Sequence, residues 1–264
     1  MKILMIGDVV GSPGRAYLAE NISRLRKELG LAAVVVNAEN AAAGSGITAP
    51  VAESLIESGI DAITLGDHTW GQKDFAPAID KLRNVVRPAN YPAGCPGKGW
   101  CLVTAPLVRF AVVNLLGRVF MQPVDCPFRV ADAVLNEIPR DVPVFVDFHA
   151  EATSEKIALA KYLDGRVTAV VGTHTHVQTS DAFVLPNGTA FQTDLGMTGP
   201  WYSSIGRDFK PVIKKFLTGM PSRFDIAEGP RTLEGAIIEF DPQTRKASSI
   251  QNFRLREPLT GKEE

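Results

Sequence analysis

The sequence predicts an α/β fold in which helices cover a parallel or mixed β-sheet. Short apolar stretches alternate with amphipathic stretches in the first part of the chain, which is typical of strand and helix units that follow one another. Pairs of apolar stretches that resemble β-hairpins follow in the last part. The chain has 264 residues with 45% hydrophobic content, enough to bury a large core, and we expect a single domain over residues 1–264.

The first strand and the first helix have the clearest signals. Residues 2–6 form an apolar run that predicts a buried strand. Ser12 and Pro13 match an N-cap and a first helical position, and leucine and isoleucine side chains then recur at helical spacing until Gly30 ends the helix. We expect this helix to pack its apolar face on the sheet.

The other expected elements follow in chain order. The strands are 33–37, 61–65, 110–115, 142–148, 168–171, 182–185, 189–192, 234–240 and 247–254, and the helices are 49–58, 129–138, 155–163 and 208–217. Asn187 and Gly188 predict a hairpin turn, and the last two strands predict a second hairpin. Residues 86–106, rich in proline and glycine, predict a long shaped loop, and residues 261–264 are expected to fray.

Charge and cysteine content exclude several classes of protein. The formal net charge is −1 and the basic residues are scattered, so we expect no strong nucleic-acid footprint, while a small phosphate ester remains a suitable substrate. The apolar run at the start is too short for a signal peptide or a membrane span, and we expect no membrane association. Cys95, Cys101 and Cys126 follow no disulfide or metal pattern, which predicts packing roles and a cytoplasmic location.

Polar side chains that can bind metals follow the predicted strands at their carboxyl ends. Five strands end in such residues, which are Asp8, Glu39 with Asn40, Asp67 with His68, His149, and His174 with His176. Ligand sites gather at the carboxyl edge of an open α/β sheet. We therefore expect these side chains to lie together at one rim.

All four histidines of the chain belong to these strand ends. The His174 and His176 pair has the His-x-His spacing that brings two imidazoles into one small volume, and neutral imidazole suits zinc, iron, manganese or nickel. The carboxylates of Asp8, Glu39 and Asp67 add enough negative charge for two divalent ions, and one carboxylate could bridge them. Two such ions about 3.5–4 Å apart can share a hydroxide and bind both the attacking and the leaving oxygens of a phosphoryl transfer.

Each of these residues taken alone has a plain structural explanation. Asp8 alone fits a turn after a strand, and His149 alone fits a core histidine bonded to a backbone carbonyl. Their occurrence together at five strand ends favours a metal site. Residues 193–200 form a glycine-containing segment that fits either the lining of a substrate pocket or a tight loop.

Five segments resemble the YmdB family of calcineurin-like metallophosphoesterases. They extend through nearly the whole chain and are GDVVGSPGR (7–15), NAENAAAGSGIT (37–48), DFHAEATSEK (147–156), GTHTHVQT (172–179) and TDLGMTGP (193–200). The resemblance implies a β-sandwich of two mixed sheets flanked by helices (α/β/β/α). It implies a dinuclear centre, most often of iron, with manganese or zinc as alternatives, and hydrolysis of phosphodiesters such as 2′,3′- or 3′,5′-cyclic nucleotides. It further implies a cytoplasmic bacterial enzyme that forms homo-oligomers.

The resemblance also implies a role for each strand-end residue. The metal ligands would be Asp8 and His176 at the first metal with Asn40 close to it, Asp67, His149 and His174 at the second metal, and Glu39 as the bridge between the two. His68 would stand beside the metals as a catalytic residue that stabilises the phosphoryl group and protonates the leaving alkoxide. The resemblance assigns no role to the arginine and lysine residues outside these motifs.

Two positions depart from the patterns of related proteins. Val10 stands where the wider calcineurin-like superfamily carries a histidine, which leaves an open position at the first metal and is usual in the YmdB branch. Asp67 stands where the family ordinarily carries asparagine. An additional carboxylate is expected to tighten metal binding while lowering the Lewis acidity of the ion, which would reduce turnover.

Two other classes of protein stay open at this point. One is a regulatory or RNA-associated protein whose metal centre is structural or weakly catalytic, although the open position at Val10 and the additional His68 argue against a closed structural site. The other is an amidohydrolase barrel. That fold carries its His-x-His pair near the first of eight strand and helix units, whereas the pair here lies at 174–176.

Overall fold

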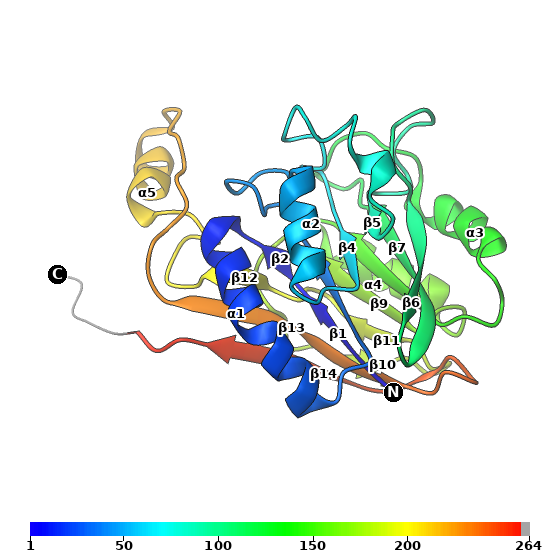
Figure 1. Cartoon of the computed structure of the whole chain (residues 1–264). Helices are drawn as coiled ribbons and strands as arrows, with labels where there is room; N and C mark the ends of the chain where they lie inside the picture. The colour runs from blue at the N-terminus through cyan, green and yellow to red at the C-terminus, as the bar shows by residue number, and fades with distance from the viewer. Residues whose placement is uncertain (260–264) are drawn as a thin grey trace.

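A computed structural model describes residues 1–259 and contains two mixed β-sheets that pack face to face (Figure 1). The first sheet has the strand order β2 (Asp8–Val9), β12 (Met197–Pro200), β13 (Arg231–Phe240), β1 (Lys2–Ile6), β3 (Ala33–Asn37), β4 (Ala62–Thr64) and β5 (Val85–Val86), with β14 (Ala247–Arg256) paired to β13. The second sheet has the order β10 (Phe183–Val184), β11 (Ala190–Gln192), β9 (Ala169–Thr173), β8 (Val144–His149), β7 (Val108–Leu116) and β6 (Trp100–Ala105).

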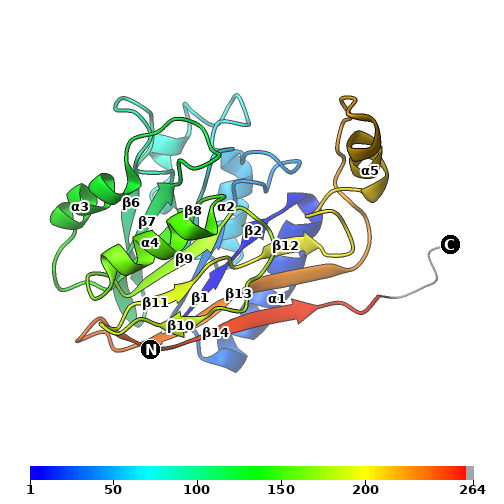
Figure 2. The ribbon, with the colours of Figure 1, turned by 180° about the vertical axis from the view of Figure 1, so that it is seen from behind.

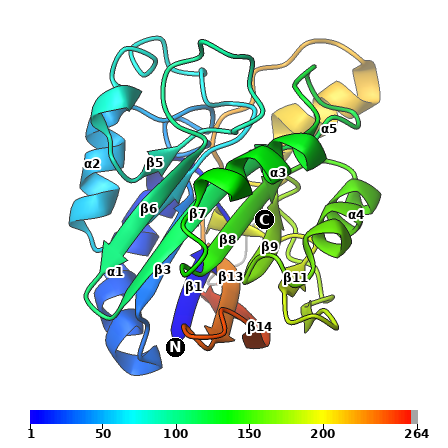
Figure 3. The same cartoon turned by 90° about the vertical axis from the view of Figure 1, so that its right-hand side faces the viewer.

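Helices cover the outer face of each sheet. The helices on the first sheet are α1 (Gly11–Leu29) and α2 (Ala49–Glu57), and those on the second are α3 (Pro127–Glu137) and α4 (Thr153–Leu163) (Figures 2 and 3). Helix α5 (Phe209–Thr218) stands apart at one edge, and a short 3-10 turn, η1 (Ile79–Lys81), precedes β5. The α/β class and the implied sandwich are therefore both confirmed.

The core lies in three layers, as this architecture requires. Apolar side chains of both sheets meet in the middle, where the Phe145 ring packs edge-on against Phe240 with ring centroids 5.3 Å apart. Leu18 and Ile22 of α1 pack on the outer face of the first sheet, and Leu159 of α4 packs on the second. Strands β3 and β8 are buried on both faces, which explains the apolar runs with which each begins.

Two expectations about local structure are wrong. Ser12 lies inside α1, which begins at Gly11 after the N-cap residue Val10 and has no side-chain cap. The region 86–106 is not all loop, because β6 pairs with β7 along the edge of the second sheet. The alternation of inward-facing Cys101 and Val103 with more exposed neighbours was the available strand signal, hidden by the surrounding prolines and glycines.

The remaining expected elements are confirmed within a few residues of their bounds. The turn at Asn187 and Gly188 joins the antiparallel strands β10 and β11, and β13 with β14 forms the closing hairpin. Part of 193–200 is the short strand β12, which was not foreseen as a strand. Within residues 1–259 no helix combines the length and apolar content needed to span a bilayer. The expected fraying of 261–264 lies outside the described residues.

Candidate metal centre

The carboxyl ends of strands from both sheets meet at one place, and all eight candidate residues lie there. Strands β1, β3 and β4 of the first sheet are mutually parallel, as are β8 and β9 of the second. The acidic and histidine side chains lie at the carboxyl ends of these strands or in the segments that directly follow them. The expected rim therefore exists, but it is formed by two sheets facing each other rather than by the edge of one.

One group of side chains could hold a cation between them. Ligand atoms of Glu39, Asp67, His149 and His174 all lie within 4.8 Å of one another. The Nε2 atom of His149 is 3.1 Å from Glu39 Oε1 and 3.1 Å from Asp67 Oδ1. His174 Nδ1 lies 3.0 Å from the same His149 nitrogen. These distances bring two carboxylates and two imidazoles into a space that suits a metal ion.

A second group adjoins the first and shares Glu39 with it. The side chain of Asn40 places its Nδ2 atom 3.1 Å from Glu39 Oε1 and 3.2 Å from His176 Nε2. His176 Nε2 is 3.8 Å from Asp8 Oδ1. That Asp8 oxygen is fully buried and has no hydrogen-bond partner among the described residues. An orphaned buried carboxylate oxygen next to an imidazole nitrogen fits a missing cation.

Three of the histidines each leave one ring nitrogen directed at the centre, because an acceptor holds the other. His149 Nδ1 lies 2.9 Å from Thr173 Oγ1, whose own proton goes to Asp147 Oδ1 at 2.7 Å. His176 Nδ1 donates to the backbone oxygen of Ile205 at 3.0 Å. His174 Nε2 lies 3.1 Å from Glu151 Oε2. Such partners fix the tautomer of metal-binding histidines and free the opposite nitrogen for the metal.

His68 differs from the other three histidines. Its Nδ1 is 3.1 Å from Glu39 Oε1, its backbone N–H donates to Glu39 Oε2, and its side chain is 45% exposed. The hydrogen bond to Glu39 raises the pKa of His68, although partial burial opposes this. His68 therefore lies beside the cluster with a half-exposed ring and a raised pKa, unlike the three histidines that point into the centre.

The pKa shifts of the residues in the centre indicate that a positive charge would be stabilised there. Burial opposes the imidazolium form of His149, but Glu39, Asp67 and Asp8 outweigh burial and raise the pKa of His149 well above its usual value. Burial alone would raise the pKa values of Glu39 and Asp67, yet the nearby histidines hold both below their usual range. The carboxylates that raise the pKa of His149 are negative charges that a bound cation would also balance.

The raised pKa of Asp8 also indicates that a positive charge would be stabilised near its carboxylate. Burial raises the pKa of Asp8 to about 7, a tendency that His149 reduces and that Glu39 and Asp194 increase. A bound cation would favour its ionised form, because an opposite charge nearby lowers a carboxyl pKa. The donor set, the orphaned oxygen and this charge balance all fit divalent ions.

Residues that support the histidines were missed by sequence reasoning. Asp147 is buried under His149 and accepts hydrogen bonds from Asn37 Nδ2 at 2.9 Å, Thr64 Oγ1 at 2.5 Å and Thr173 Oγ1 at 2.7 Å. Burial raises the pKa of Asp147, and these donors oppose the rise. The available signal was adjacency, since Thr173 precedes His174 and Glu151 follows His149 by two positions. Sequence neighbours of this kind often orient metal ligands.

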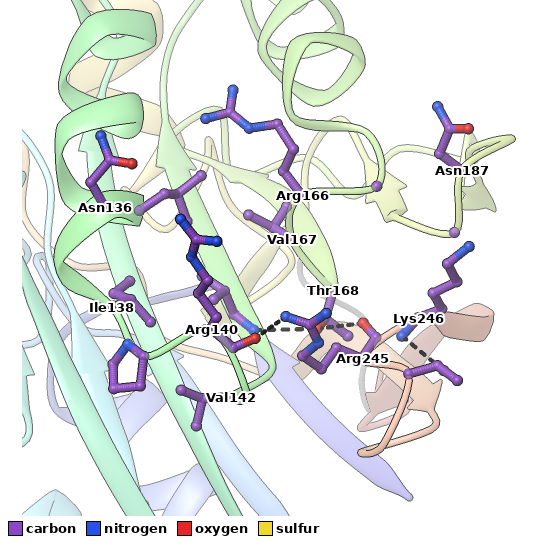
Figure 4. Close-up of a pocket in the computed structure, with 16 residues that line it drawn as sticks. Asn136, Ile138, Arg140, Val142, Arg166, Val167, Thr168, Asn187, Arg245 and Lys246 are labelled. Carbon is purple, nitrogen blue, oxygen red and sulfur yellow. Dashed lines mark hydrogen bonds between the residues drawn. The ribbon is translucent and has the colours of Figure 1, made fainter.

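A basic hollow at the amino ends of β8 and β9 lies outside this centre (Figure 4). Its volume is about 380 Å³, and its lining includes Arg140, Arg166, Arg245 and Lys246. Arg166 is paired with Asp132 at 2.6 Å, and Arg245 donates to the backbone oxygen of Arg140. None of the predicted site residues lines it, so this basic hollow is separate from the centre and lies at the other end of the second sheet.

Comparison with known proteins identifies relatives over nearly the whole length of this chain. Residues 4–253 match the family model described as YmdB-like protein. The 2′,3′-cyclic-nucleotide 2′-phosphodiesterase of Bacillus subtilis is 51% identical over 258 residues, which cover 97% of this chain and 98% of that protein.

Two solved structures have nearly the same fold over nearly the whole chain. A hypothetical protein from Thermus thermophilus superposes with a TM-score of 0.91 at 41% identity and covers 98% of this chain and 100% of its own. A novel phosphatase from Mycoplasma pneumoniae has a TM-score of 0.91 at 34% identity and covers 97% of this chain and 93% of its own. We conclude that the chain is an enzyme of the YmdB-like family with the calcineurin-like metallophosphoesterase fold.

Proposed function

We propose that the protein hydrolyses phosphodiesters with two divalent metal ions, and that 2′,3′-cyclic nucleotides are its first substrates, with 3′,5′-cyclic nucleotides next. The observation that carries the proposal is the convergence of buried carboxylates and tautomer-fixed imidazoles from both sheets. The Bacillus subtilis relative is named for hydrolysis of 2′,3′-cyclic nucleotides, and its identity to this chain extends over almost its whole length.

The distances between their side-chain atoms divide the proposed ligands into two sets. Asp8, His176 and the amide of Asn40 would hold the first cation, Asp67, His149 and His174 would hold the second, and Glu39, which contacts both sets, would bridge them. When bound, such a pair supplies an activated water at neutral pH and polarises the phosphoryl oxygens. Asn40 would bind through its amide oxygen, so the amide must turn from the orientation in which its nitrogen faces His176.

His68 is the proposed catalytic acid. The hydrogen bond from its Nδ1 to Glu39 orients the ring and favours its protonated form, while its exposure leaves the ring accessible to substrate. An imidazolium placed beside the phosphoryl group stabilises developing negative charge and gives its proton to the leaving alkoxide. His68 thus needs no contact with a metal ion to act.

The remaining proposals concern the identity of the metal, the domain organisation, the location and the oligomeric state. The mixed nitrogen and oxygen ligands accept iron, manganese or zinc. We expect iron first because of the family resemblance, with manganese or zinc as alternatives. Residues 1–259 supply the site from both sheets, which supports a single working domain over 1–264. Free thiols on all three cysteines support a reducing cytoplasm, and the family resemblance supports a homo-oligomer.

The most direct test combines metal analysis with hydrolysis assays. We expect protein purified without chelator to carry close to two metal ions per chain and to cleave bis-p-nitrophenyl phosphate and 2′,3′-cyclic nucleotides. Removal of the metal should abolish activity, and adding Mn²⁺ or Fe²⁺ back should restore it. The absence of both bound metal and hydrolysis would contradict the proposal and favour a regulatory or RNA-associated protein.

Asp67→Asn is expected to change binding and turnover in opposite directions. The variant keeps an oxygen that can face His149 Nε2 but removes a carboxylate charge, so metal should be lost at lower chelator concentration. A less neutralised ion polarises substrate more strongly, and we expect kcat to rise a few-fold in the fully loaded variant. The exposed Asp80, whose carboxylate accepts from Gly97 N, provides an Asp80→Asn control. Unchanged metal affinity and unchanged kcat would refute this account of Asp67.

A further inference from the structure

The His-x-His segment adopts a backbone conformation that something else must hold in place. His174 has a φ of 101° and His176 a φ of 63°, a region that side chains other than glycine rarely occupy. Strain of this kind persists only where the surroundings enforce it, and it concentrates at functional sites. Besides the contacts of the two histidines themselves, buried contacts hold the residue between them, Thr175.

Asp194 fixes Thr175 through its carboxylate. The Oδ2 atom accepts the backbone N–H of Thr175 at 3.1 Å and the hydroxyl of Thr175 at 2.8 Å. Lys156 donates to the same oxygen at 2.8 Å, and Gly196 N donates to Oδ1 at 2.9 Å. Asp194 is 0% exposed and Lys156 is 1% exposed, so water offers no substitute for these bonds.

The position of Asp194 in the fold connects both sheets to the histidine loop. It lies between β11, which belongs to the second sheet, and β12, which belongs to the first and pairs with β2 beside Asp8. Lys156 comes from α4 on the outer face of the second sheet. The same carboxylate therefore ties the loop to a helix and to the segment that crosses from one sheet to the other.

The two histidines on either side of Thr175 face different parts of the centre. His174 turns to the group of His149 and Asp67, and its backbone N–H donates to Asp8 Oδ2 at 3.0 Å. His176 turns to Asn40. Rotation of the peptide groups at Thr175 would move both imidazoles at once, because it lies between them.

We propose that Asp194 is a positioning residue for the metal centre: it holds Thr175, and thereby directs His174 and His176 at the two cation positions. This rests on the proposed function. The plainer alternative is that Asp194 only neutralises the buried ammonium of Lys156. A buried ion pair can often be exchanged for apolar side chains of similar size without loss of stability. The two explanations therefore separate when both charges are removed together.

The first test is the double variant Lys156→Met with Asp194→Leu in the full-length protein. Removing both charges leaves no unpaired buried ion, but the donors of Thr175 and Gly196 lose their acceptor, so we expect a folded protein whose thermal unfolding temperature is moderately lower. Zn²⁺ binding to the chelator-stripped protein, measured by competition with a chromophoric chelator, should weaken by about 10- to 100-fold, the range found when groups that orient metal ligands are removed. A folded double variant that binds Zn²⁺ with unchanged affinity would overturn the proposal.

The second test is Thr175→Val, which alters the tie without removing a charge. It deletes the hydroxyl that donates to Asp194 and is expected to weaken Zn²⁺ binding several-fold. Thr189→Val is the matched control, since Thr189 is buried, donates to Val167 O at 2.7 Å and accepts from Gly165 N at 2.8 Å, far from the centre. Equal Zn²⁺ affinities for the two variants would overturn the proposal even if the double variant fails to fold.

Nuclear magnetic resonance of the histidine rings gives a readout that does not depend on metal. The chain has four histidines, so their ring nitrogen signals can be resolved and assigned by substitution. In the metal-free Thr175→Val variant we expect the signals of His174 and His176 to move and that of His68 to stay. Unmodified protein that binds no Zn²⁺ would refute the proposed function itself, whereas normal binding with unmoved signals in the variant would refute only the positioning role.

Discussion

Glu39→Gln should give a folded protein that loses its metal and almost all of its activity. Glu39 contacts side chains of both ligand groups, and its carboxylate faces His149, His68 and Asn40 at 3.1 Å each. Glutamine keeps the shape and one acceptor oxygen but removes the negative charge. We expect fewer than two metal ions per chain. Because both ions are needed for the reaction, kcat/KM should fall by more than about a thousandfold, at about 1.4 kcal/mol for each factor of ten.

A matched control distinguishes the loss of the bridge from the loss of any buried charge. Glu155 is also buried, and its carboxylate accepts the backbone N–H groups of Arg118 and Val119. Glu155→Gln removes a carboxylate of similar burial and should keep both metal ions and most of the activity. If Glu39→Gln retained full metal content, determined by mass spectrometry of the native protein, Glu39 would not be the bridge.

His68→Ala should separate catalysis from metal binding. The His68 ring contacts Glu39 and is half exposed, whereas the other three histidines have their second nitrogen held by an acceptor. We therefore expect the variant to keep its metal content while kcat on 2′,3′-cyclic nucleotides falls by about 10²- to 10⁴-fold, the usual contribution of a general acid. KM should change much less than kcat.

The choice of substrate provides the internal control for His68. A p-nitrophenolate leaving group departs without a proton, whereas a ribose alkoxide needs one, so an acid matters more for the second. Bis-p-nitrophenyl phosphate hydrolysis by His68→Ala should fall by a smaller factor than cyclic nucleotide hydrolysis. Equal losses on both substrates would show that His68 stabilises the phosphoryl group without protonating the leaving oxygen. Loss of metal from the variant would make His68 a ligand.

The candidate residues could be predicted from the sequence because their signal is local. Each follows a short apolar strand, and parallel strands bring their carboxyl ends to a common edge whatever the details of packing. The sequence did not foresee that two sheets supply this edge. Nor did strand-end spacing separate His68 from the ligands, since the difference lies in what holds the second ring nitrogen of each histidine.

The residues that support the site escaped prediction because their partners are distant in the chain. Asn37 donates to Asp147, 110 positions away, and Lys156 donates to Asp194, 38 positions away. Each residue seen alone has the composition of an ordinary loop or helix. Strand β6 was missed for a different reason, because the prolines and glycines before it masked its alternation.

The position of β13 in the first sheet determines when the site can form. This strand, Arg231–Phe240, lies between β12 and β1, and β12 in turn pairs with β2, which carries Asp8. A growing chain that ends before residue 231 therefore lacks the strand that joins β1 to β12. Domains fold as units during synthesis. We expect metal to be acquired only after β13 has entered the sheet, so the ion bound reflects the pool that surrounds the folded domain.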